Sequence, residues 1–169
     1  MSLTLHTSHG DLKIELEVAL CPNLCRNFLA LAASGSYDNT KFHRNVAKFM
    51  IQGGDPTGTG KGGEAIDGGY LDDEIVDTLR HSERGIVAMA NRGSNTNGSQ
   101  FYITYGPMPS LDGHSSIIGR VVDGLSTLDA MERVPVKGKK CRPLQDIVLQ
   151  CVTIHANPIA QEEVPAAES

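Results

Sequence analysis

Apolar and polar residues alternate along most of the patterned segments of the chain. Near the start, Leu3 and Leu5 alternate with polar residues, the letters TSHGD interrupt the pattern, and Leu12, Ile14 and Leu16 resume it. Alternation places apolar side chains on one face of a β-strand, and a Gly-containing turn between two such runs is typical of a hairpin. Further strands are predicted where β-branched or aromatic residues are bounded by Gly, Asn, Asp or Pro, over 41–46, 49–53, 85–90, 100–105, 116–122 and 146–155.

Two segments have helical spacing instead. Over 20–34 the apolar residues share one helical face, Pro22 suits the first turn, and Gly35 can adopt the left-handed conformation that ends a helix. A shorter amphipathic segment covers 124–132. These strands and helices do not alternate as βαβ units. The pattern therefore predicts a mainly β protein, a closed eight-stranded antiparallel β-barrel capped by two α-helices.

Length and composition are those of one ordinary globular domain. The chain has 169 residues, of which 40% are hydrophobic. We assign residues 1–156 to the domain and expect the polar, proline-containing segment 157–169 to be a partly disordered tail. The net charge of −5 argues against direct binding of nucleic acid, and the basic run KGKK at 137–140 is interpreted as a solvated loop. We expect a monomer.

Targeting and cysteine patterns indicate a compartment. The N-terminal segment lacks the basic and continuous apolar regions of a signal peptide, and no apolar window has the length of a membrane span. Cys21, Cys25, Cys141 and Cys151 do not have the spacing of a metal site and are interpreted as free thiols in a reducing compartment. We therefore expect an intracellular protein, cytoplasmic or nuclear, without membrane association.

Strand alternation places an unusual mixture of side chains on one face of three predicted strands. This face collects Arg44, Met50, Gln52, Gln100 and Tyr102. A barrel interior would not hold a guanidinium and two amides without partners, so the face is predicted to line a groove outside the barrel. From alternation alone, Arg44 is equally interpreted as a surface arginine whose stem covers apolar neighbours, and His43, on the opposite face, as a core histidine.

Motifs for nucleotide or metal chemistry are absent from the sequence. The glycine-rich segment GDPTGTGKGG at 54–63 does not have phosphate-loop spacing, because Asp55 stands where that motif needs glycine and Gly62 where it needs Ser or Thr. The sequence contains neither GxSxG nor HExxH. We therefore expect no metal and no cofactor.

Three segments carry a resemblance to a known family. FHRNVAKFMIQGGD (42–55), MANRGSNTNGSQFYI (89–103) and LDGHSSIIGRV (111–121) resemble the cyclophilins, and the similarity runs in the same order from about residue 2 to residue 155. The chain looks most like the small single-domain cyclophilins found in spliceosomes. The resemblance implies an eight-stranded antiparallel barrel with two helices, in agreement with the hydrophobic pattern.

The resemblance also implies roles for matching residues. Arg44 corresponds to the catalytic arginine of the family. The apolar pocket for the substrate proline corresponds to Phe49, Met50 and Leu111, and the amides that hold the peptide backbone correspond to Gln52 and Gln100. The neighbouring loop positions correspond to Gly60, Ala90, Asn91 and Arg92. Alternation alone sends Phe49 inward, and a bulge or twist near Ala47–Lys48 would re-aim it.

Three substrate-binding positions depart from the family pattern. Tyr102 stands where phenylalanine is usual, Ser110 where many members have tryptophan, and Ser115 where many have histidine or tyrosine. The proline pocket is thereby expected to lose ring surface on one wall and to gain a hydroxyl. Weak binding of the cyclic-peptide inhibitor cyclosporin is the implied consequence.

The resemblance implies a peptidyl-prolyl cis-trans isomerase that accelerates rotation about X-Pro bonds and assists folding or conformational switching. Its partners would be proline-containing peptides and proteins, with spliceosomal proteins among them, and no cofactor would be needed. Two alternatives stay open from the sequence. The chain could be a proline-peptide binding module, or a structural subunit of a splicing complex, with weak catalysis in either case.

Overall fold

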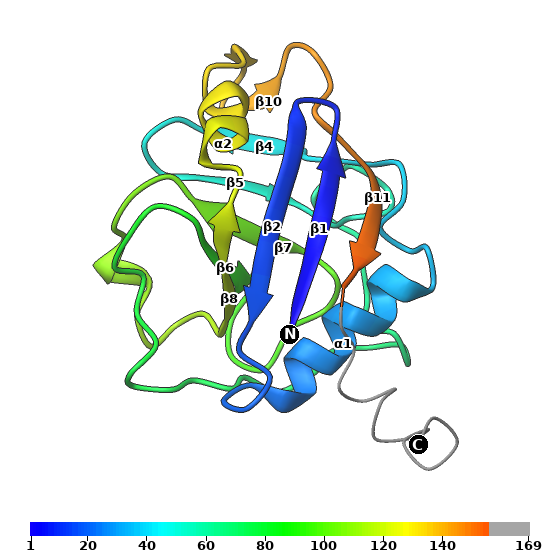
Figure 1. Ribbon diagram of the computed structural model, residues 1–169, viewed down its shortest axis with the longest axis vertical. Helices are drawn as coiled ribbons and strands as arrows, with labels where there is room; N and C mark the ends of the chain where they lie inside the picture. The colour runs from blue at the N-terminus through cyan, green and yellow to red at the C-terminus, as the bar shows by residue number, and fades with distance from the viewer. Residues whose placement is uncertain (156–169) are drawn as a thin grey trace.

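The computed structural model describes residues 1–155, so the predicted tail at 157–169 lies outside the described residues. The strands, in chain order, are β1 (Ser2–Thr7), β2 (Gly10–Leu16), β3 (Thr40–Lys41), β4 (Arg44–Val46), β5 (Met50–Gly53), β6 (Ile86–Met89), β7 (Phe101–Thr104), β8 (Ile117–Asp123), β9 (Val136–Lys137), β10 (Arg142–Pro143) and β11 (Val148–Ile154). The helices are α1 (Pro22–Ala33) and α2 (Leu125–Glu132), with a 3-10 turn at Pro109–Leu111 (Figure 1). Within these residues, no helix has the length and apolar character of a membrane span.

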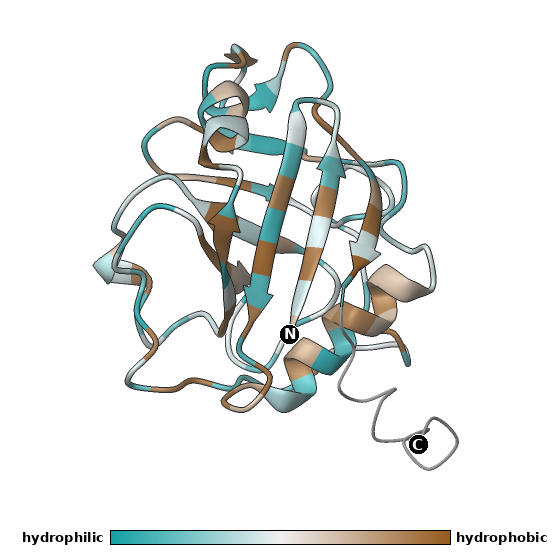
Figure 2. Cartoon of the chain, in the orientation of Figure 1, coloured by the Kyte–Doolittle hydropathy of each residue, from teal (hydrophilic) through white to brown (hydrophobic). Residues whose placement is uncertain are grey.

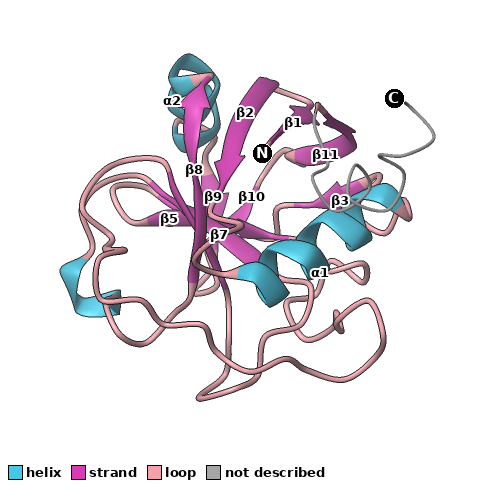
Figure 3. Cartoon of the chain, turned by 60° about the horizontal axis from the view of Figure 1, so that its bottom comes forward, coloured by secondary structure: helices cyan, strands magenta, loops and turns pink. Residues whose placement is uncertain are grey.

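Nine strands form one strongly curled antiparallel sheet in the order β3-β11-β1-β2-β8-β6-β7-β5-β4. The two edge strands, β3 and β4, are consecutive in the chain and only Phe42 and His43 separate them. The strand predicted over 41–46 is therefore interrupted, with its first part at one edge of the sheet and its second part at the other. If it is counted as one strand, eight strands surround the barrel. The prediction of a mainly β, barrel-like fold with two helices is confirmed; α1 and α2 lie toward opposite ends (Figures 1 and 3).

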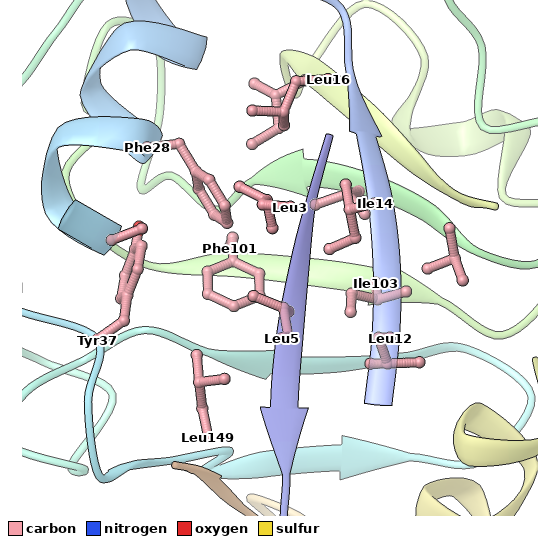
Figure 4. Packing of buried hydrophobic residues seen from close by; sticks show 14 of the residues in the cluster. Leu3, Leu5, Leu12, Ile14, Leu16, Phe28, Tyr37, Phe101, Ile103 and Leu149 are labelled. Carbon is pink, nitrogen blue, oxygen red and sulfur yellow. The ribbon is translucent and has the colours of Figure 1, made fainter. Parts of the chain in front are cut away.

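The core lies inside the curl of the sheet. Hydrophobic and more polar positions alternate along β1 and β2 (Figure 2). Leu3, Leu5, Leu12 and Ile14 have no exposed surface. The ring of Phe101 packs edge-on against Phe28, Tyr37 and Phe42, with ring centroids 5.2, 5.5 and 6.0 Å away. Figure 4 shows Phe101 with Phe28 and Tyr37. This aromatic group joins α1 to β7, because Phe28 comes from the helix and Phe101 from the strand.

Asn45 fixes β4 against α2. Its side chain is only 1% exposed. Its Nδ2 donates to the carbonyl oxygens of Met131 (2.9 Å) and Val134 (3.4 Å), and its Oδ1 accepts from the Tyr105 hydroxyl at 2.6 Å. A buried amide is stable only when its donors and acceptors have hydrogen-bond partners. Asn45 finds these partners on the inner side of β4, so its side chain faces inward. Alternation along β4 then turns Arg44 and Val46 to the other face.

The short hairpin of β9 and β10 was not predicted from the sequence. Its two residue pairs, Arg142–Lys137 and Pro143–Val136, are too short to show a hydrophobic period. The backbone N–H of Asn45 donates to the Cys141 carbonyl at 2.9 Å, which places this hairpin beside β4. The basic run 137–140 therefore lies near the residues of β4.

We expect Asn45→Ala to lower the free energy of unfolding by about 2–3 kcal/mol, because it leaves the Met131 carbonyl and the Tyr105 hydroxyl buried without partners. Urea denaturation measures this change. Asn23→Ala is the matched control: Asn23 is exposed on α1, and the change should stay within about 0.5 kcal/mol. Equal effects of the two substitutions would contradict the role of Asn45.

Candidate active site

The predicted polar face lies on the outside of the curled sheet. In register, Arg44 pairs with Gln52, Gln52 with Tyr102, and Tyr102 with Ala88, so these residues form one row across β4, β5, β7 and β6. Met50 and Tyr102 belong to a small apolar cluster with Ile86, Ala88 and Ile117, separate from the main core. Phe101 and Ile103, from the other face of β7, belong to the main core. The alternation predicted this separation of faces.

A cavity of about 240 Å³ opens on this face. It is lined by Arg44, Phe49, Met50, Gln52, Ala90, Asn91, Tyr102, Leu111, His114 and Ser115. All but His114 are among the predicted site residues, and His114 follows directly on the LDG of a segment that carries the family resemblance. The wall combines apolar side chains with the guanidinium of Arg44 and the amides of Gln52 and Asn91, a mixture typical of ligand pockets.

Four predicted residues lie outside this cavity. Gly60, Arg92 and Gln100 line a neighbouring cavity of about 130 Å³, which also includes Gln52, Ala90 and Asn91. Ser110 is exposed on the 3-10 turn and lines neither cavity. The structure therefore gathers the predicted residues into two adjoining hollows, with Ser110 beyond the rim next to Leu111.

A turn re-aims Phe49 toward the groove, at the place where a bulge was expected. Lys48 has a φ of 68°, in the left-handed region, and the N–H of Phe49 donates to the Val46 carbonyl at 2.9 Å. The N–H of Lys48 donates to the Glu132 carboxylate at the end of α2 (2.7 Å), which holds this unusual backbone. Phe49 consequently lies under Arg44, whose guanidinium carbon is 5.9 Å from the ring centroid.

Arg44 is partly exposed and forms no ion pair within residues 1–155. Arg84 is the informative contrast, because its guanidinium contacts both Asp129 (2.7 Å) and Glu132 (2.8 Å). The Phe49 ring supports the Arg44 guanidinium from one side through a cation–π contact and leaves its N–H groups available. Arg44 can therefore donate hydrogen bonds to a ligand in the cavity.

Two amides fix the polar end of the groove. Gln52 Nε2 donates to Gln100 Oε1 at 2.8 Å. Gln100 Nε2 in turn donates to the carbonyl oxygens of Gly60 (3.0 Å) and Gly62 (2.8 Å). The amide of Gln100 is thus occupied by the loop and by Gln52, whereas Gln52 Oε1 meets no donor among the described side chains. Gln52 therefore keeps an acceptor available, and Gln100 orients its amide.

The hydroxyl of Tyr102 contacts a buried histidine. It lies 2.7 Å from His81 Nε2, and His81 Nδ1 lies 2.8 Å from Asp112 Oδ1. The backbone N–H of His81 also donates to Asp112, and these bonds lower the pKa of that carboxyl. Burial raises the pKa of Tyr102 to about 12, so the hydroxyl stays protonated near neutral pH. His81 and Asp112 were missed, because no sequence period links them to the groove.

His43 is buried, as predicted for a core histidine, but it is not fully satisfied. Its Nδ1 has no hydrogen-bond partner, and its ring lies under Gly60, where an added Cβ would stand 3.1 Å from the ring. Burial lowers the pKa of His43, so the ring is neutral near pH 7. No group of three His, Cys, Asp or Glu in residues 1–155 is arranged to hold a metal ion.

Comparison with known proteins agrees with this geometry. Residues 2–154 match the family model described as "Cyclophilin type peptidyl-prolyl cis-trans isomerase/CLD". The human "Peptidyl-prolyl cis-trans isomerase-like 3" is 55% identical over 161 residues, which cover 95% of this chain and 100% of that protein. The protein of the same name from Rhizopus delemar is 57% identical over 171 residues, or 97% of this chain and 100% of the relative.

A solved structure is also similar. The crystal structure of a cyclophilin-type peptidyl-prolyl cis-trans isomerase from Cryptosporidium parvum, in the presence of the dipeptide Ala-Pro, matches with a TM-score of 0.90 and 50% sequence identity. The match covers 93% of this chain and 100% of that one.

We expect Tyr102→Phe to lower the free energy of unfolding by about 1–2 kcal/mol, because buried His81 Nε2 loses its partner. The ring that forms the cavity wall is kept, so the rate on a short X-Pro peptide should change by less than about threefold. Chemical denaturation and exchange NMR measure the two effects. Tyr70→Phe, at a tyrosine that is 56% exposed, is the control for loss of a hydroxyl. A stability unchanged by Tyr102→Phe would exclude the role assigned to the His81 contact.

Proposed function

The chain belongs to the cyclophilin-type peptidyl-prolyl cis-trans isomerases, and we propose that Arg44 is its catalytic residue and that the 240 Å³ cavity receives the substrate proline. The observation that carries the proposal is the unpaired guanidinium of Arg44. It lies at the rim of an apolar hollow, and no acidic group of residues 1–155 neutralises it.

The reaction makes use of such a cation. Resonance gives the peptide C–N bond double-bond character and a rotation barrier of about 18–20 kcal/mol. In the twisted transition state this resonance is lost, and the proline nitrogen regains a lone pair that can accept a hydrogen bond. A guanidinium aimed at that nitrogen binds the twisted form better than either planar form, and this differential binding lowers the barrier. The step requires no nucleophile and no proton transfer.

The other residues hold the substrate while the bond rotates. Phe49, Met50 and Leu111 enclose the proline ring, with Tyr102 as the floor. Gln52 Oε1 accepts a backbone N–H of the peptide, and Gln100 keeps Gln52 in place through the 2.8 Å bond between the two amides. The structure of the Cryptosporidium parvum relative was determined in the presence of Ala-Pro, which supports binding of proline peptides.

The cellular partners are a separate proposal that rests on the resemblance to spliceosome-associated cyclophilins. We propose proline-containing segments of splicing proteins as substrates, in the nucleus or the cytoplasm. Co-purification with wild-type protein and with Arg44→Ala distinguishes two kinds of partner. Partners held by the groove are lost with the substitution, whereas partners bound to other surfaces are retained.

We expect Arg44→Ala to lower kcat/KM on an X-Pro peptide by about 100- to 1000-fold with the fold intact, since the substitution removes a donor that acts in the transition state. Arg44→Lys should recover little activity, because a compact ammonium lacks the planar fork of guanidinium. Exchange NMR measures the rate. Arg120→Ala, at an exposed arginine on β8, is the matched control and should keep full activity. Full activity of Arg44→Ala would remove the arginine mechanism.

We also expect weak binding of cyclosporin. Ser110 stands where many family members have a tryptophan ring. Without that ring the rim lacks a hydrogen-bond donor and apolar area, and the binding free energy is expected to fall by about 2–4 kcal/mol, or about 30- to 1000-fold in affinity. Ser110→Trp should recover part of this affinity and change the rate on a short peptide less, because Ser110 lies outside the cavity. Calorimetric titration compares the two proteins. Nanomolar binding by the wild type, or no gain in Ser110→Trp, would show that this rim does not govern the inhibitor.

A further inference from the structure

A third and larger hollow, of about 350 Å³, adjoins the proline cavity. It is lined by His43, Arg44, Gln52, Thr59, Gly60, Lys61, Lys139, Lys140 and Arg142. Arg44 and Gln52 line both hollows, so a peptide whose proline occupies the first would extend directly into the second. We call this third hollow the basic cavity.

The walls of the basic cavity are fixed by hydrogen bonds between separate segments. On one side is the loop 54–63, and on the other the hairpin of β9 and β10. Arg142 bridges them, because its NH1 donates to the Gly58 carbonyl at 2.8 Å. The hairpin is attached to β4 through the bond from the Asn45 N–H to Cys141. The cationic groups are therefore carried by segments attached to one another and to the sheet.

The charge of the basic cavity opposes that of the whole chain. The chain carries 20 acidic and 15 basic residues, yet five of the residues that line this cavity are Lys or Arg and none is Asp or Glu. None of these five forms an ion pair within residues 1–155. Converging cations without counterions attract an anionic ligand.

Of the two neighbouring titratable groups, Asp55 offsets only part of the charge of the five cations, and His43 adds none while it is neutral. The carboxylate of Asp55 is fully buried and accepts hydrogen bonds from the backbone N–H groups of Thr57, Gly60 and Gly62 (2.9, 2.7 and 3.1 Å), so it serves the loop. Burial raises the pKa of Asp55, but these hydrogen bonds outweigh burial and the pKa is lowered. His43, which also lines the cavity, is 7% exposed and keeps its Nδ1 without a partner.

We propose that the basic cavity recognises an anionic side chain, a carboxylate or a phosphate, that flanks the proline of the substrate on one side. The proposal rests on the proposed function of Arg44 and the proline cavity. A peptide is the occupant that the observations favour, because the cavity shares Arg44 and Gln52 with the peptide groove and because a chain of net charge −5 repels an extended polyphosphate. The substrate class is therefore an acidic or phosphorylated segment around an X-Pro bond.

Exchange NMR on a scanned peptide series tests the proposal. A neutral host peptide with one X-Pro bond is compared with variants that carry glutamate at each of the three positions before and after that dipeptide, and with phosphoserine at the best of these positions. Glutamate on one side should raise kcat/KM by roughly tenfold, with phosphoserine at least as effective. The gain should shrink as salt rises from about 20 to about 300 mM. Equal rates for all peptides would overturn the proposal and leave the proposed function standing.

Charge-neutralising variants locate the effect. Lys139→Gln/Lys140→Gln removes two exposed cations of the basic cavity and should abolish most of the preference for glutamate. Lys13→Gln/Arg26→Gln removes the same charge from exposed positions on β2 and α1, and should keep the preference. A preference that survives in the first variant, or is lost equally in both, would show a global charge effect and overturn the proposal.

Binding measurements separate failure of the two proposals. If no peptide is isomerised, the proposed function of Arg44 fails, and titration of ¹⁵N-labelled protein with the glutamate peptide still decides the inference. Amide shifts over 58–61 and 137–142 would support an anion site, and their absence would overturn it. A single-stranded RNA oligonucleotide is titrated in parallel. Tighter binding of RNA than of the phosphoserine peptide at the same residues would overturn the assignment to a peptide.

Discussion

The buried amide of Asn45 is the interaction on which the groove depends. Its contacts with Met131, Val134 and Tyr105 occupy both of its polar atoms and join β4 to α2 and to the residue that follows β7. Because adjacent side chains on a strand point to opposite faces, the inward Asn45 directs Arg44 outward. The guanidinium of Arg44, which we propose to be catalytic, is thus placed by a neighbouring residue on the opposite face of the strand.

Around Arg44 the protein satisfies nearly every other polar group. Gln100 is bonded to the loop carbonyls, Gln52 to Gln100, and Tyr102 to His81. These bonds leave little freedom in the walls, so ordering them on substrate binding costs little entropy. The groups left available include the Arg44 guanidinium and one oxygen of Gln52, and in the proposed mechanism these bind the proline nitrogen and a peptide N–H.

The contrast between Arg44 and Arg84 shows how one residue type serves two purposes. Arg84 is held by two carboxylates and by the Tyr105 carbonyl, and it ties α2 to the start of β6. Arg44 is supported only by an aromatic face, which steadies a guanidinium without occupying its hydrogen bonds. The same absence of counterions continues into the basic cavity, so the groove and its extension form one positive strip on an acidic protein.

Local pattern in the sequence determined the strands of the curled sheet, both helices and the separation of faces, because alternation and helical period depend only on neighbouring residues. The residue types of the groove, including Arg44, Gln52 and Tyr102, followed from the same alternation, and the family resemblance supplied their roles.

Contacts between distant residues lie beyond such patterns. Glu132 holds the turn that re-aims Phe49 from 84 positions away. His81 meets Tyr102, the basic run at 137–140 lies beside Arg44, and one interrupted strand forms both edges of the sheet. Only the tertiary structure decided these features, because each depends on which separate segments the folded barrel brings together.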